Sequence, residues 1–81
     1  MKKIEMKMPY LATTTDTVTV LSWLVEVDGP IKRGEPLLEI ETDKSIMEVE
    51  SYTTGTLCEI HVQPGDEVVV GELIATIEVE G

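Results

Sequence analysis

Residues 57–78 read LCEIHVQPGDEVVVGELIATIE, and the chain shows a related pattern 37 positions earlier, where residues 20–41 read VLSWLVEVDGPIKRGEPLLEIE. At this offset apolar residues fall on apolar residues, and Gly34-Glu35 falls on Gly71-Glu72. Two copies are too few for a stacked repeat array, which needs three or more units. The repeat therefore predicts one closed domain whose halves are related by pseudo-two-fold symmetry.

Both halves have the residue pattern of β-strands. Six segments are rich in β-branched residues and often alternate apolar and polar side chains: residues 3–8, 17–25, 36–42, 45–51, 55–62 and 72–79. Prolines and glycines separate them, as turns require. The alternation places Leu38 and Ile40 inward, with Glu39 and Glu41 outward. We expect an all-β fold, a flattened β-barrel or sandwich of two small antiparallel sheets.

The bulk composition limits the function classes. Residues 1–81 suffice for one small domain, and 16 acidic against 6 basic residues give a net charge of −10. This charge repels phosphate backbones and anionic lipids, so we expect no nucleic-acid and no membrane partner. The single cysteine, Cys58, allows no internal disulfide, and His61 has no second ligand at metal-binding spacing.

The N-terminal residues do not have the pattern of a targeting segment, and no apolar run reaches membrane length. We expect the isolated domain to be a monomer. Its expected location is the cytoplasm of a bacterium, or the mitochondrial matrix of a eukaryote.

Four polar residues, Thr42-Asp43-Lys44-Ser45, lie between two predicted strands. They predict a tight turn with Asp43 and Lys44 at its centre. The turn has no glycine, which favours a type I-like conformation over the primed turns of most two-residue hairpins. Lys44 is then exposed at the apex of a rigid hairpin. By itself such a lysine is only a solvated charge, so its neighbours decide the interpretation.

Those neighbours resemble a known family. EIETDKSIMEVES, residues 39–51, and GTLCEIHVQPGDEVVVGELIATIE, residues 55–78, resemble the lipoyl domains of 2-oxo acid dehydrogenase complexes, specifically those of the dihydrolipoyl acyltransferases. WLVEVDGPIKRGEPL, residues 23–37, is similar to the first half of the same domain. The resemblance covers residues 3–80 and implies the lipoyl/biotinyl-domain fold, with lipoic acid amide-linked to Lys44.

The resemblance also implies roles for the surrounding residues. The turn residues that would help the lipoate-attaching enzyme to recognise the site are Glu41, Thr42, Asp43 and Ser45. The loop of residues 9–17 would contact a decarboxylase, and its candidate contact residues are Leu11, Ala12, Thr13, Thr14, Thr15 and Asp16. Three departures from the family pattern concern turns and a strand entry: Asp28-Gly29 inverts the usual order, Val18 stands at a frequent glycine, and residues 11–17 lack one.

The function that the resemblance implies is that of a carrier with no catalytic residues of its own. Lipoate on Lys44 would act as a swinging arm for acyl groups and reducing equivalents. The implied partners are a thiamine-diphosphate-dependent 2-oxo acid decarboxylase, an acyltransferase core and dihydrolipoyl dehydrogenase. The chain contains no acyltransferase core, so we expect it to be one domain of a longer multidomain acyltransferase.

Two alternatives stay open. A biotin carrier of the same fold would place its lysine in a Met-Lys-Met turn, and this chain has Met6-Lys7-Met8, but within the first predicted strand, where both methionines alternate with Ile4 toward the core. An unmodified β-sandwich that serves only in assembly would need neither lysine. The offset of 37 also maps Lys44 onto Lys7, which predicts that the two lysines occupy equivalent ends of the domain.

Overall fold

The computed structural model describes residues 2–10 and 17–80, which form eight β-strands. The strands are β1 (Lys2–Lys7), β2 (Thr17–Trp23), β3 (Pro30–Ile31), β4 (Pro36–Glu41), β5 (Ile46–Glu50), β6 (Gly55–Ile60), β7 (Glu67–Val69) and β8 (Leu73–Val79). One four-stranded sheet has the order β1-β8-β6-β3 and the other β5-β4-β2-β7, with antiparallel pairing throughout. The all-β prediction and its six longer strands are confirmed.

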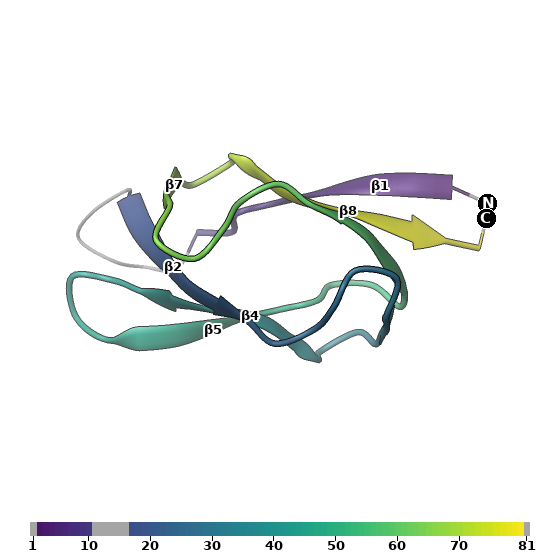
Figure 1. The fold of residues 1–81 in the computed structure, drawn as a ribbon, viewed down its shortest axis with the longest axis horizontal. Helices are drawn as coiled ribbons and strands as arrows, with labels where there is room; N and C mark the ends of the chain where they lie inside the picture. Colours follow the sequence, from purple (N-terminus) through teal and green to yellow (C-terminus); the bar gives the residue numbers. More distant parts are fainter. Residues whose placement is uncertain (1, 11–16, 81) are drawn as a thin grey trace.

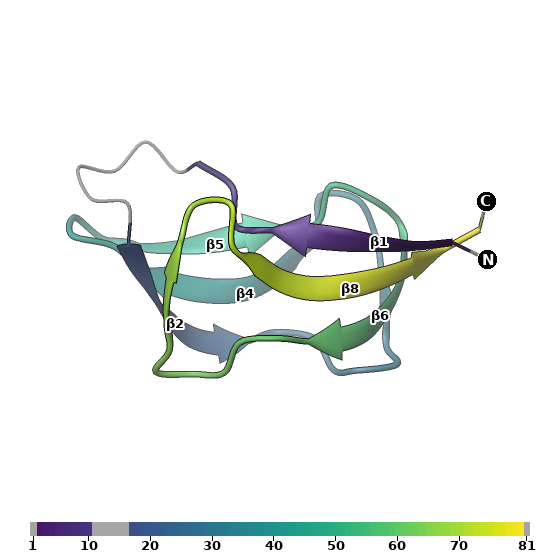
Figure 2. The ribbon, with the colours of Figure 1, turned by 90° about the horizontal axis from the view of Figure 1, so that it is seen from above.

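The molecule is elongated, with extents of 37 × 20 × 19 Å. In both orientations the two chain ends lie together at one end of the long axis, and the connection between β4 and β5 lies at the other (Figures 1 and 2). The β4–β5 turn therefore projects away from the chain termini. In the part of the chain that is described, no helix has the length and apolar character needed to cross a membrane.

The pseudo-two-fold symmetry is present in the backbone hydrogen bonds. The N–H of Val20 donates to the carbonyl of Asp66 at 2.9 Å, and the N–H of Leu57 donates to the carbonyl of Gly29 at 3.0 Å. Residues 20 and 29 become 57 and 66 when 37 is added, so the repeat exchanges the two bonds. It relates β2, β3 and β4 to β6, β7 and β8, as the sequence predicted.

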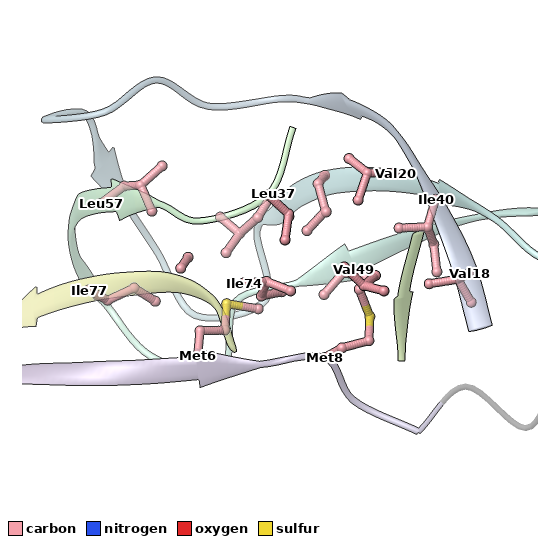
Figure 3. Packing of buried hydrophobic residues seen from close by; sticks show 14 of the residues in the cluster. Met6, Met8, Val18, Val20, Leu37, Ile40, Val49, Leu57, Ile74 and Ile77 are labelled. Carbon is pink, nitrogen blue, oxygen red and sulfur yellow. The ribbon is translucent and has the colours of Figure 1, made fainter. Parts of the chain in front are cut away.

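The core lies between the two sheets (Figure 3). Leu38 and Ile40 are fully buried, as the alternation predicted, but Leu37 and its counterpart Ile74 are fully buried as well. Strict alternation would turn these two residues outward. A register shift occurs at each of them, so that the pairing with the neighbouring strand skips one residue. Such β-bulges turn two consecutive side chains toward the core.

β1 and β5 are equivalent strands, but their offset differs from that of the other strands. Met6 pairs with Ala75, and Val49 pairs with Leu38. Because Ala75 and Leu38 are related by 37 positions, Met6 and Val49 are equivalent, and their offset is 49 − 6 = 43. The chain between β1 and β2 is thus six residues (43 − 37) longer than its counterpart between β5 and β6.

This longer connection corrects the expected relation between the two lysines. With the offset of 43, Lys7 is equivalent to Glu50, and Lys44 is equivalent to position 1 of the chain. The prediction that Lys7 and Lys44 occupy equivalent ends is therefore wrong. Lys7 is the last residue of β1, where it pairs with Leu73, and does not lie at a turn apex.

Asp28 has a left-handed backbone conformation, with a φ of +72°, and its counterpart Gly65 has a φ of +96°. A left-handed conformation costs a residue with a side chain roughly 1–2 kcal/mol, although aspartate tolerates it better than most. The inverted Asp28-Gly29 order thus places a side chain where the other half of the domain has glycine.

We predict that Asp28→Gly raises the free energy of unfolding by about 0.5 kcal/mol, after subtraction of the greater freedom of glycine in the unfolded chain. Gly65→Ala should lower the free energy of unfolding by about 1 kcal/mol, because alanine is strained at the positive φ of residue 65. Urea unfolding followed by the fluorescence of Trp23 measures both changes. A destabilised Asp28→Gly variant would contradict the strain at this residue.

Candidate functional site: the Lys44 hairpin

Lys44 lies at the apex of the turn that joins the paired strands β4 and β5. Glu41 of β4 pairs with Ile46 of β5, and residues 42–45 connect them. Lys44 is exposed, and so are its neighbours Asp43 and Ser45. The hairpin apex is the extremity of the molecule opposite the chain termini (Figure 1).

The side chain of Thr42 holds the turn together. Its Oγ1 atom accepts hydrogen bonds from the backbone N–H groups of Lys44 (3.1 Å) and Ser45 (3.0 Å), and it donates to the carbonyl of Ser45 (2.8 Å). The backbone N–H of Thr42 donates to the same carbonyl at 2.9 Å. No turn residue has a positive φ, which excludes primed turns and agrees with the predicted type I-like conformation. A hydroxyl group thus orders a turn that lacks glycine.

We predict that Thr42→Val destabilises the domain by about 1 kcal/mol, because the valine has nearly the same shape but makes none of the three side-chain hydrogen bonds. Thr42→Ser keeps the hydroxyl and should stay within about 0.5 kcal/mol of the wild type. Urea unfolding measures the cost. Backbone ¹⁵N order parameters at residues 43–45 should fall in Thr42→Val only; unchanged order there would contradict this role of the hydroxyl.

The Lys44 side chain is available for chemistry. Within the described residues, no hydrogen bond or ion pair involves its ammonium group. The two nearest carboxylates in the sequence, Glu41 and Asp43, are both exposed. A primary amine at a rigid, exposed apex satisfies the steric requirement of an enzyme that must acylate it. The residues present therefore fit an amide-linked prosthetic group.

The remaining candidates are the loop residues 11–16, the biotin-like triplet and the single histidine. Leu11, Ala12, Thr13, Thr14, Thr15 and Asp16 lie outside the described residues. In the biotin-like triplet, Met6 and Met8 are buried in the core, as predicted, and Lys7 belongs to a strand. His61 Nε2 lies 2.8 Å from the hydroxyl of Thr76, and residues 2–10 and 17–80 contain no cluster of three possible metal ligands.

The comparisons with known proteins agree with this geometry. Residues 4–77 match the biotin/lipoyl family model, described as a biotin-requiring enzyme. The chain is 43% identical over 79 residues to the dihydrolipoyllysine-residue acetyltransferase component of the pyruvate dehydrogenase complex of Zymomonas mobilis, and 41% identical over 73 residues to the dihydrolipoyllysine-residue succinyltransferase component of the 2-oxoglutarate dehydrogenase complex of Bacillus subtilis. These alignments cover 96% and 90% of the chain but only 18% of each relative.

A solved structure aligns with nearly the whole chain. The lipoyl domain of the 2-oxoglutarate dehydrogenase complex from Azotobacter vinelandii aligns with a TM-score of 0.75 and 35% identity, over 96% of this chain and 99% of that domain. The chain therefore belongs to the biotin/lipoyl domain family. Within this family it is a lipoyl carrier domain of the 2-oxo acid dehydrogenase acyltransferase type.

Proposed function

We propose that Lys44 is the residue to which lipoate is attached, and that the domain carries acyl groups and reducing equivalents on that side chain. The observation that carries this proposal is the exposed Lys44 amine at the apex of a hairpin ordered by Thr42. When bound, lipoate supplies a dithiolane that accepts an acyl group together with two electrons.

The residues of the chain supply presentation rather than catalysis. The core residues of β4 and β5 fix the hairpin, and Thr42 fixes the turn, so the backbone of Lys44 is held in one position while its side chain stays free. A rigid attachment point and a long flexible arm keep the effective concentration of the carried group high at each active site within reach. The exposed carboxylates Glu41 and Asp43 are available for recognition by the lipoate-attaching enzyme.

The partners follow from the relatives, which are components of 2-oxo acid dehydrogenase complexes. We infer that a thiamine-diphosphate-dependent decarboxylase loads the domain, an acyltransferase core unloads the acyl group, and dihydrolipoyl dehydrogenase reoxidises the arm. The chain spans about a fifth of the length of these relatives. We therefore propose that it is one domain of a longer parent protein, which also contains the acyltransferase core.

The test compares the two prosthetic groups of the family. The domain is co-expressed with a lipoate ligase or with a biotin ligase, and its intact mass is measured. We expect one lipoyl group per chain and no biotin, because the biotin-like Lys7 lies in a strand and not in a turn. Biotin addition, or the absence of any lipoyl group, would contradict the proposal.

A further inference from the structure

The pseudo-two-fold symmetry provides an internal reference for the surface near Lys44. The turns that follow β7 and β3 have the same backbone: Gly71 and Gly34 have φ values of +89° and +88°. The N–H of Glu72 donates to the carbonyl of Val69 at 3.0 Å, and the N–H of Glu35 donates to that of Lys32 at 2.9 Å. The two glutamate side chains also accept equivalent bonds, from the N–H groups of Val69 (3.2 Å) and Lys32 (2.9 Å).

These identical turns carry different side chains at their exposed positions. Val69 and Val70 are 45% and 41% exposed, whereas the equivalent residues at the other end of the molecule are Lys32 and Arg33. The fold itself thus accommodates two basic residues in this turn. Neither core packing nor turn geometry requires valines there, so another property of the surface must favour them.

Ile46 shows the same contrast. It pairs with Glu41 next to Lys44 and is 59% exposed. Its equivalent, with the offset of 43, is Lys3, which pairs with Glu78, the equivalent of Glu41. One copy of the repeat therefore places a lysine opposite the glutamate, and the copy that carries the hairpin places an exposed isoleucine there.

Ile46 and Val69 lie on the outward face of the β5-β4-β2-β7 sheet, and the exposed Val70 follows Val69 in the turn after β7. Val68 is buried, so Val69 on the same strand points outward, and it pairs with Thr17 at the hairpin end of β2. Ile46 also points outward, at the opposite margin of the sheet. Figure 2 shows β7 and the β4–β5 hairpin in the same half of the molecule. Glu41 on β4 lies between the two margins, and the exposed Asp43 in the adjoining turn adds a second negative charge.

We propose that Ile46, Val69 and Val70 form a docking face for the thiamine-diphosphate-dependent 2-oxo acid decarboxylase. The proposal rests on the proposed function of Lys44. Specific protein interfaces combine apolar contacts with polar and charged ones, and here exposed apolar side chains flank the charged Glu41. The substrate of a 2-oxo acid decarboxylase is a carboxylate anion, and an active-site entrance that attracts this anion is positively charged. The positive charge of such an entrance complements the negative charge of Glu41 and Asp43 on the hairpin. An unrelated apolar surface would lack this complementary charge.

The test uses the repeat to design variants that the fold accepts. Val69→Lys/Val70→Arg copies the opposite turn, and Val69→Ser/Val70→Ser removes the apolar surface without adding charge. The lipoylated wild type is first assayed for reductive acylation with pyruvate, 2-oxoglutarate, branched-chain and acetoin-type decarboxylases. The enzyme that acylates it fastest is then used to assay each lipoylated variant. We expect kcat/KM to fall at least about tenfold through KM for both variants, and further for the basic one.

Lys32→Val/Arg33→Val is the matched control at the other end and should stay within about twofold of the wild type. A second readout uses the domain without lipoate and with labelled methyl groups. On addition of the decarboxylase, the Ile46, Val69 and Val70 signals should broaden, while Val27, also 45% exposed, should not.

The outcomes separate the two proposals. Lipoylated serine and lysine–arginine variants that are acylated within twofold of the wild type would overturn the docking face and leave the carrier function intact. A wild-type domain that accepts no lipoate, or that none of the decarboxylases acylates, would overturn the proposed function and the docking face with it.

Discussion

Lys44→Arg should abolish lipoylation completely, so that intact-mass spectrometry after co-expression with a lipoate ligase finds only the unmodified chain. Arginine keeps the positive charge and occupies the same exposed apex, so the hairpin and its Thr42 hydrogen bonds stay in place. The guanidinium group stays protonated at all accessible pH values and is not an acyl acceptor under these conditions. Reductive acylation of the variant should fall below detection, because the effective concentration created by the tether is lost.

The matched control for this change is Lys7→Arg. Lys7 is exposed on β1 and pairs with Leu73, so the same substitution should leave the domain folded and fully lipoylated. Modification that survives Lys44→Arg but disappears in Lys7→Arg would transfer the site to the biotin-like triplet. Circular dichroism of the two variants should be indistinguishable, which separates the loss of the acceptor from a loss of the fold.

Ile40→Ala should have the largest effect on stability. Ile40 is fully buried in β4, one residue before Glu41, and its truncation leaves a cavity in the core that extends to the base of the hairpin. Truncations of this kind cost about 2–5 kcal/mol. For 81 residues, the free energy of unfolding at 25 °C is roughly 4–12 kcal/mol, so a single truncation consumes a large share of it.

Ile46→Ala is the matched control, because it removes the same atoms from the adjacent strand of the same hairpin, where the side chain is 59% exposed. Its cost should be within about 0.5 kcal/mol. Trp23 reports the unfolding of both variants, since its indole packs against the core and its Nε1–H donates to the carbonyl of Val62 at 3.0 Å. Equal costs for the two truncations would show that burial in this hairpin is not as described.

The fold could be predicted from the repeat because two halves of one sequence carry the same apolar positions. The two short strands β3 and β7 were not predicted, since Pro30–Ile31 and Glu67–Val69 are too short to display an alternation. The inward orientation of Leu37 and Ile74 also escaped prediction, because a bulge changes the parity of a strand without a distinctive residue. The long connection after β1 then hid the second offset, and with it the true counterpart of Lys7.

The apex position of Lys44 followed from four polar residues between two strand patterns, and the structure confirms its exposure. The hydrogen bonds of Thr42 depend on the rotamer of its side chain, which the pattern of apolar and polar residues does not reveal. Exposed valines at residues 69 and 70 look like strand residues in the sequence. They become informative only when the structure superimposes their turn on the one that carries Lys32 and Arg33.

The strand pairing has a consequence for the order of folding. β4 and β5 are the only paired strands of the described chain that follow each other directly, whereas Lys2 must meet Val79 across nearly the whole sequence. Closing long loops delays such distant pairings, and proteins dominated by them fold in milliseconds to seconds. Among the described residues, the hairpin that carries Lys44 is thus the one part of either sheet whose pairing requires only local chain closure. We expect its formation to precede the slow assembly of the two sheets.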